Sequence, residues 1–370
     1  MWRMTPRRRL LAVAVAAAAA VLLAAGAGLY YATRPGPTTA AAIPPAAVAQ
    51  DNAASAQDNA ASAQNNAAAG WVRKTPGGDC GCALGSAYSF FVRTADPAKV
   101  VLYLDGGGAC WSARTCAPSS GNRYKTDVQG PDTEGIFDFG NPRNPLAGYS
   151  VVYVPYCTAD VHLGHAITTY APGLTIHHEG YANGSAALKQ LVESFPQATQ
   201  VVVVGASAGS VAAPFYAGLV ADRLPAAHVT SIADSSGSYP DAPAADKLLT
   251  GSAWNASAVL PAHPSLPGLV VDSAKRHPGI VFARIDHTQD ADQKEHLKLL
   301  GLPTNDLPGL LAANRTLIEK AGVTLHSYAE PGADHVIVDD NALYRETAGG
   351  VALSDWLTAL VTGKPAPDVG

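Results

Sequence analysis

The run VVVVGASAGSVAAPF, residues 201–215, constrains the fold of this chain more than any other stretch. Four consecutive valines predict a strand that is buried on both faces, as in the interior of a parallel sheet. Gly-Ala-Ser-Ala-Gly follows at once, and the small residues after it favour a helix. The two glycines suit a turn so tight that a Cβ would not fit between the strand and helix backbones. The stretch therefore predicts a strand–turn–helix unit of an α/β fold, with Ser207 on the turn.

Apolar runs and helical periodicities alternate through the rest of residues 71–370. The expected strands are 87–93, 98–104, 149–156, 201–205, 228–234, 279–286 and 323–330, with a turn at Asp96-Pro97. The expected helices are 179–194, 209–222, 305–321 and 350–362, and the interval 111–148 is expected to form a surface loop. This order predicts an α/β fold, in which a mostly parallel sheet carries helices on both faces. Ligands bind such sheets beyond the carboxyl ends of the strands.

The first 32 residues have the pattern of an export signal. Three arginines at 7–9 precede an uncharged run of 23 residues, mostly alanine, leucine and valine. One interpretation is a cleaved signal peptide, with Ala25-Gly26-Ala27 as the cleavage site. Because a run of this length can also cross a bilayer as a helix, an uncleaved transmembrane signal anchor is the other. Either one places the rest of the chain outside the cytoplasm, secreted or tethered to the outer face of the cytoplasmic membrane.

Residues 33–70 are predicted to form a disordered, low-complexity linker. They contain the heptads AQDNAAS, AQDNAAS and AQNNAAA, whose apolar positions are all alanine, so they lack the large side chains that hold a coiled coil together. The folded domain is therefore expected to span residues 71–370. The chain has a net charge of −5, but its first 70 residues hold five arginines against two aspartates, which leaves −8 on this domain. An acidic domain without a basic patch predicts no nucleic-acid partner.

Five cysteines, at positions 80, 82, 110, 116 and 157, fit an oxidising compartment. Cys110 and Cys116 are close enough in sequence to bridge, which would stabilise the fold by about 2 kcal/mol on the chain-entropy model. A bridge between Cys82 and Cys157 would close a much longer loop, worth about 4 kcal/mol, and would leave Cys80 unpaired. A zinc site at Cys80 and Cys82 is disfavoured, because Cys-x-Cys is tighter than zinc-ribbon spacing and has no second pair.

The stretch GASAG, residues 205–209, matches the G-x-S-x-G nucleophile elbow, in the required position between a strand and a helix. A serine hydroxyl attacks a carbonyl only with the help of a base, which an acid orients in turn. On this type of fold the chain order is serine, acid, histidine. Among the histidines that follow the serine and the candidate acids, His335 is the one that stands in a short loop directly after an expected strand. The first candidate for the acid is Asp286, and the alternatives are Asp290 and Asp292.

The stretch LYLDGGGAC, residues 102–110, places three glycines directly after an early expected strand. Glycine leaves the backbone N–H groups uncovered, so they can approach an oxyanion, as in the HGGG-type loops of esterases. The expected oxyanion-hole donors are the N–H groups of Gly107 and Gly108, together with that of Ala208 after the serine.

Several stretches together make the chain resemble the pectin acetylesterase/Notum family of carboxylesterases. They are CALGSAYSFFV (82–92), LDGGGACWSARTC (104–116), VPYCTADVHLG (154–164), GASAGSVAA (205–213), IADSSG (232–237) and GADHVI (332–337). In this order they resemble the family's Cys-x-x-Gly-Ser segment, glycine-rich oxyanion stretch with two cysteines, Tyr-Cys strand end, nucleophile elbow, aspartate-containing strand end and late histidine. The resemblance covers about residues 78–345 and implies an α/β-hydrolase-like fold.

The resemblance implies roles for residues at these positions. The implied nucleophile is Ser207, the orienting acid Asp286 and the base His335, and the implied disulfides are Cys110–Cys116 and Cys82–Cys157. Many relatives have tryptophan where this chain has Ala109. The acid motif, Tyr-Asp-Ser-Trp-Gln in plant members, is Ile-Asp-His-Thr-Gln at residues 285–289 here. The aspartate is kept but its substrate-facing neighbours differ, so the resemblance does not fix the substrate. The acidic charge of the domain does not favour pectin.

Four further side chains are expected at the rim of the substrate cleft: Trp111, Asp160, His162 and His287. A metal site at Asp160 and His162 is disfavoured, because a third ligand at useful spacing is missing. Neither a metal nor another cofactor is expected.

The expected function is that of an exported serine carboxylesterase. It would remove an acetyl or another short acyl group from an alcohol, with an acetylated polysaccharide as one candidate substrate. Two other classes stay open. One is a catalytically silent, surface-tethered binding module, and the other is an amidase or lipase-like hydrolase that uses the same triad.

Overall fold

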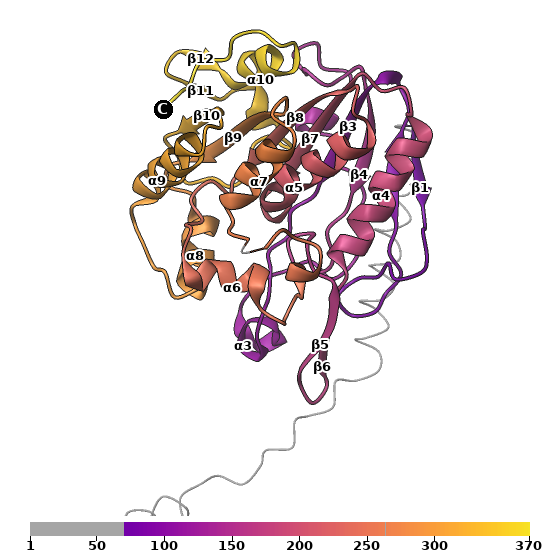
Figure 1. The fold of residues 1–370 in the computed structure, drawn as a ribbon, viewed down its shortest axis with the longest axis vertical. Helices are drawn as coiled ribbons and strands as arrows, with labels where there is room; N and C mark the ends of the chain where they lie inside the picture. Colours follow the sequence, from indigo (N-terminus) through magenta and orange to yellow (C-terminus); the bar gives the residue numbers. More distant parts are fainter. Residues whose placement is uncertain (1–69, 263) are drawn as a thin grey trace, which may run out of the picture. The chain divides into compact units, whose positions relative to one another are not determined.

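An eight-stranded sheet forms the centre of the folded domain (Figure 1). The computed structural model describes residues 70–370 apart from residue 263. The predicted signal or anchor at 1–32 therefore lies outside the described residues, as does the predicted linker at 33–70 except for its last residue. Among the residues that are described, no helix combines the length and the apolar character needed to cross a membrane.

Across the sheet the strands follow the order β1-β2-β4-β3-β7-β8-β9-β10. Their bounds are β1 (Trp71–Lys74), β2 (Phe90–Arg93), β3 (Asp96–Leu104), β4 (Tyr149–Val154), β7 (Gln200–Ala206), β8 (His228–Asp234), β9 (Val281–His287) and β10 (Leu325–Glu330). The β1–β2 and β2–β4 pairs are antiparallel, and every pair from β4 to β10 is parallel. The predicted mostly parallel sheet is confirmed, and the carboxyl ends of its parallel strands meet at one edge.

Helices cover both faces of this sheet, as predicted. On one face lie α4 (Gly180–Ser194), α5 (Ala208–Arg223), α7 (Gly268–Arg276) and α9 (Leu307–Lys320), and on the other lies α10 (Leu353–Val361). The valine run shows why both faces need cover. Because successive side chains of a strand point to opposite faces, Val201 and Val203 pack into one core, and Val202 and Val204 into the other. All four valines are at most 1% exposed.

The remaining elements are short. They are α3 (Ala113–Cys116), α6 (Pro243–Thr250), α8 (Ala291–Leu299), the hairpins of β5 (Ala166–Ala171) with β6 (Leu174–His178) and of β11 (Thr347–Ala348) with β12 (Val351–Ala352), and the 3-10 helices η1 (Pro118–Ser120), η2 (Gly135–Phe137), η3 (Ala256–Ala258) and η4 (Asn341–Tyr344). The interval 111–148 holds little regular structure, as expected. The expected turn at Asp96-Pro97 is wrong, because these residues open β3. A register shift between Asp96 and Val100 accommodates the proline, which has no N–H for the ladder.

Two disulfides hold the segments around the glycine-rich loop. Cys82–Cys157 and Cys110–Cys116 are both present, as the resemblance implied. The first spans 75 residues of sequence and links the loop before β2 to the segment after β4, whereas the second spans six residues around α3. Cys80 is the free cysteine of the described residues. Disulfides of this kind fit an extracytoplasmic location.

Candidate active site

Ser207 stands at the turn between β7 and α5. Its backbone has φ 50° and ψ −114°, and a positive φ is rare for a residue other than glycine. The flanking glycines permit this turn. A Cβ at Gly205 would overlap the backbone of Gly209, and a Cβ at Gly209 would overlap the carbonyl group of Leu104. The strained turn holds Ser207 at the carboxyl end of the sheet.

The hydroxyl group of Ser207 is hydrogen-bonded to His335, with 2.7 Å between Oγ and Nε2. On the other side of the imidazole ring, Nδ1 lies 2.7 Å from Oδ2 of Asp290. Because a carboxylate only accepts hydrogen bonds, Nδ1 carries the proton and Nε2 accepts from the hydroxyl. His335 follows β10, and Asp290 follows β9 and caps the N-terminus of α8. The three side chains form one hydrogen-bonded chain at the carboxyl ends of three strands.

The carboxylate beside His335 thus belongs to Asp290, one of the alternatives, and not to Asp286. Strand β9 continues to His287, one residue beyond the expected end, so Asp286 still lies inside the sheet. Its carboxylate accepts hydrogen bonds from the backbone N–H of Gly237 at 2.8 Å and from the Gln293 amide at 3.3 Å. Asp290 lies beyond the end of the strand and reaches His335, whereas Asp286 does not, which corrects the predicted position of the acid.

One feature of the sequence points to Asp290, and a second fits Asp290 and Asp286 equally. Aspartate is a preferred residue at a helix N-cap, and Oδ1 of Asp290 accepts from the backbone N–H of Gln293 at 2.9 Å. Residues 290–293 also have the Asp-x-x-Gln spacing of the plant motif, which residues 286–289 share. The side-chain amide of Gln293 donates to both Asp290 and Asp286. Spacing alone therefore cannot separate the two aspartates, whereas the end of the strand does.

The charges around His335 favour its protonated form. Burial lowers the pKa of this imidazole, but the hydrogen bond to Asp290 and the negative charges of Asp290, Asp292 and Asp234 outweigh burial. The pKa of His335 is therefore raised above its ordinary value. A stabilised imidazolium is what a base needs once it has taken a proton from a hydroxyl group.

The glycine loop after β3 lies next to Ser207. The N–H of Gly106 donates to the side chain of the preceding aspartate at 2.8 Å. Within the described residues, no hydrogen bond engages the N–H groups of Gly107, Gly108 or Ala208. Ala208 is the first residue of α5, where the helix itself provides no acceptor. Unpartnered N–H groups beside a hydroxyl are suited to hold an oxyanion.

Two spaces meet at Ser207. Ser207 and His335 line a cleft of about 1010 Å³, whose charged lining includes Arg123, Lys125, Asp127, Asp292 and Glu295. Ser207 also lines an apolar recess of about 40 Å³, together with Ala109, Trp111, Val161, Leu266 and Leu300. The reactive hydroxyl thus stands between a large polar space and a small apolar one.

His296 lines both spaces, although it is not among the site residues expected from the sequence. Its Nδ1 lies 2.9 Å from the carbonyl oxygen of Asp292, one helical turn earlier. Since a carbonyl only accepts, Nδ1 carries the proton and Nε2 is left as an acceptor. The spacing to Asp292 on one helix face is the signal that could have placed His296 beside the cleft.

A family model for pectinacetylesterase matches residues 61–254, more than half of the chain. The chain belongs to the pectinacetylesterase family. The resemblance drawn from the motifs is confirmed, and membership supports an esterase or deacylase of the carboxylesterase type. The matched residues of this pectinacetylesterase include the Ser207 turn and the glycine loop, and they end before Asp290 and His335.

Among solved structures, the pectinacetylesterase chain is similar to the Wnt deacylase Notum from Drosophila. The two are 17% identical, with a TM-score of 0.56, over 80% of this chain and 95% of that chain. At this identity the likeness shows the fold, which is the α/β-hydrolase-like fold that was predicted. A search of curated proteins found no match to the chain.

Of the four side chains expected at the rim of the cleft, Trp111 lines the recess and the other three are buried elsewhere. Asp160 accepts from the N–H of Gly180 at 2.7 Å. Burial lowers the pKa of His162 to about 4, so the ring is neutral, and its Nε2 donates to the carbonyl of Asp105 at 2.8 Å. The expected rim positions of Asp160 and His162 are therefore wrong, because both side chains are buried and hydrogen-bonded to backbone groups inside the domain.

His287 is also corrected from the rim to the interior. It is 3% exposed at the end of β9, and its ring packs against Gly332 in the loop before His335. The strand extends one residue farther than expected, which turns this side chain into the protein rather than toward the substrate cleft.

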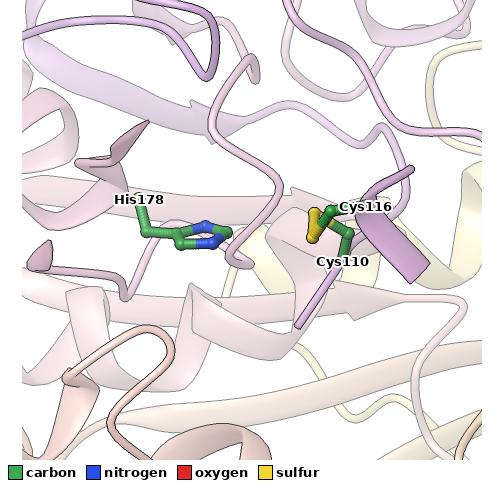
Figure 2. A group of neighbouring side chains, drawn as sticks. All are labelled: Cys110, Cys116 and His178. Atoms are coloured by element: carbon green, nitrogen blue, oxygen red, sulfur yellow. A yellow bond between two sulfur atoms is a disulfide. The ribbon is translucent and has the colours of Figure 1, made fainter. Parts of the chain in front are cut away.

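Figure 2 shows a cluster that resembles a metal site, formed by Cys110, Cys116 and His178. The two sulfur atoms are joined to each other, so neither is a thiolate that could bind an ion. Both ring nitrogens of His178 are also engaged, one by the carbonyl of Thr158 at 3.0 Å and the other by the hydroxyl of Tyr170 at 2.9 Å. The arrangement is therefore a packing contact around a disulfide.

Proposed function

We propose that this pectinacetylesterase is an exported serine carboxylesterase that removes short acyl groups, above all acetyl, from saccharide hydroxyls. The observation that carries the proposal is the hydrogen-bonded chain of Ser207, His335 and Asp290 next to unpartnered backbone N–H groups. The pattern of residues 1–32 and the two disulfides support export.

Ser207 Oγ would attack the ester carbonyl while Nε2 of His335 takes the hydroxyl proton. Asp290 would hold the ring and stabilise the imidazolium. The N–H groups of Gly107, Gly108 and Ala208 would hold the negative charge of the tetrahedral intermediate. His335 would then protonate the leaving alcohol, and a water molecule, deprotonated by the same ring, would hydrolyse the acyl-enzyme.

The recess beside Ser207 supports a short acyl group. Its volume of about 40 Å³ has room for only a few water-sized groups. Apolar side chains surround it, so it suits a methyl group better than a polar substituent. An acetyl group fits this space, whereas a long acyl chain would require the recess to widen.

The cleft supports a saccharide as the alcohol. Its volume of about 1010 Å³ lies at the upper end for ligand pockets, and polar groups line it. Acidic side chains outnumber Arg123 and Lys125 in the lining, with Asp105, Asp127, Asp292, Glu295 and Asp339 among them. A neutral acetylated polysaccharide such as xylan is therefore a better substrate than a polyuronate, which the acidic groups would repel.

Labelling with a fluorophosphonate probe tests the nucleophile. The wild-type chain should form an adduct at Ser207, and Ser207→Ala should form none and lose ester hydrolysis. Absence of an adduct in the wild-type protein would favour a silent binding module. Turnover of p-nitrophenyl esters of increasing length, of matched anilides, and of acetylated xylan against acetylated pectin tests the substrate. Faster cleavage of anilides than of esters would favour an amidase.

A further inference from the structure

A second group of titratable side chains lies at the ends of β9 and β10, outside the proposed catalytic residues. His287 ends β9, Glu330 ends β10, and the two are opposite each other in the parallel register. Glu346 directly precedes β11. One ring nitrogen of His287 and one carboxylate oxygen from each glutamate all lie within 4.8 Å of one another.

Two polar atoms of this group are buried without a partner. Nδ1 of His287 and Oε2 of Glu330 have no hydrogen-bond partner within the described residues, and the two side chains belong to residues only 3% and 7% exposed. Most buried polar groups in proteins are paired, so each such atom requires an explanation.

The two glutamates also crowd each other. A carboxylate oxygen of Glu330 and one of Glu346 lie within 4.8 Å of each other. A pair of carboxylates this close is relieved either by a shared proton or by a bound cation. An imidazole nitrogen beside the pair adds a third metal ligand, whereas a proton shared by the two carboxylates would leave Nδ1 of His287 without a partner.

We propose that His287, Glu330 and Glu346 form a structural binding site for a divalent transition-metal ion, Zn²⁺ in the first place. One nitrogen and two carboxylate oxygens are ligands that Zn²⁺ accepts, and the two negative charges balance its charge. Ca²⁺ and Mg²⁺ fit less well, because they take six or more ligands, mostly oxygens. Glu346 is half-buried, so it leaves a path for the ion and for water as a further ligand.

The ion would clamp the two segments that carry Asp290 and His335. Beyond His287 and Glu330 these segments are already paired, by the hydrogen bonds from Thr288 N–H to Glu330 (2.8 Å) and from Gln289 N–H to Gly332 (2.8 Å). A metal bond between the two strand ends would reinforce this pairing. The ion would hold the fold and would add no step to ester hydrolysis.

Calorimetric titration of the full chain with Zn²⁺, after dialysis against a chelator, tests the site. We expect one ion per chain and a rise in melting temperature when the ion binds. Co²⁺ should show the visible absorption bands of a four- or five-coordinate site with nitrogen and oxygen ligands. Glu346→Gln should weaken Zn²⁺ binding by about 10- to 100-fold or more. Glu330→Gln should do the same, and it serves as the second variant if the first is unstable.

The matched control is Glu295→Gln, because Glu295 lines the cleft near His296 and His335, where Zn²⁺ could also bind. The control should keep the Zn²⁺ affinity of the wild type. Failure of the wild-type chain to bind Zn²⁺ would overturn the proposal. So would unchanged affinity in both Glu346→Gln and Glu330→Gln, or a loss of binding in Glu295→Gln.

Discussion

Asp290 is the residue whose side chain orients the proposed base. It is fully buried, holds Nδ1 of His335 at 2.7 Å, and is itself held by the backbone and side chain of Gln293. A carboxylate with so many fixed partners cannot turn away from the ring. The proposed tautomer of His335 therefore depends on the negative charge of this one group.

We expect Asp290→Asn to lower kcat by about 10⁴-fold, because an amide that donates to Nδ1 would select the wrong tautomer of His335. Asp286→Asn is the matched control, because it makes the same chemical change at an aspartate that does not contact His335. Its kcat should fall far less. Steady-state hydrolysis of p-nitrophenyl acetate measures both. If Asp286→Asn lost far more activity than Asp290→Asn, the acid would be Asp286 after all.

The raised pKa of His335 predicts the acid side of the pH profile. The base works only when neutral, so kcat/KM should fall as the pH drops through a midpoint above the ordinary histidine value. Asp292→Asn removes a negative charge that stabilises the imidazolium, so the pKa should fall and the midpoint should move to lower pH. Because Asp292 is exposed, salt should reduce the shift. A midpoint that moved upward would contradict this account.

Trp111 limits the recess that would receive the acyl group. We expect Trp111→Ala to raise kcat/KM for the butyrate ester relative to acetate by roughly tenfold or more, since a methylene in an apolar pocket changes the rate by about 10- to 200-fold. A series of p-nitrophenyl esters measures the ratio. An unchanged ratio would show that the acyl group binds elsewhere.

At the scale of elements, the glycine loop after β3 depends on close backbone contact. Gly108 has φ 74°, and a Cβ there would overlap the carbonyl of Arg123. His162 holds the start of the same loop, because its Nε2 donates a hydrogen bond to the carbonyl of Asp105. These contacts hold the N–H groups of Gly107 and Gly108 in place, so the proposed oxyanion hole is formed before substrate arrives.

We expect Gly108→Ala to lower kcat by about 10²-fold or more, because the displaced loop would no longer hold the oxyanion. Gly173→Ala is the matched control. It has a similar φ of 77°, but a Cβ there meets nothing within 4 Å. Gly173→Ala should keep the kcat of the wild type. Its melting temperature should fall by a similar amount to that of Gly108→Ala as far as the positive φ is the cause. Equal losses of kcat in both variants would mean that strain alone, and not the loop position, sets the rate.

At the scale of the whole molecule, the two disulfides differ in the length of chain that they close. Cys82→Ala with Cys157→Ala should lower the free energy of unfolding by about 4 kcal/mol, and Cys110→Ala with Cys116→Ala by about 2 kcal/mol. Because both cysteines of a pair are replaced, neither double variant gains a free thiol in addition to that of Cys80. Urea unfolding of the two double variants measures the difference, and the reverse order would contradict the chain-entropy explanation.

Local sequence patterns were enough to predict much of this protein. Period-two and helical patterns are local properties, so the parallel sheet followed from them with all its strands except β1, as did the Ser207 turn and the helices α4, α5, α9 and α10. The family's motifs implied both disulfides. The acid was decided only in the tertiary structure, because whether Asp286 or Asp290 reaches His335 depends on where β9 ends, and that end is set by pairing with β10. Contacts between distant segments likewise buried Asp160, His162 and His287 and brought Glu330 and Glu346 together.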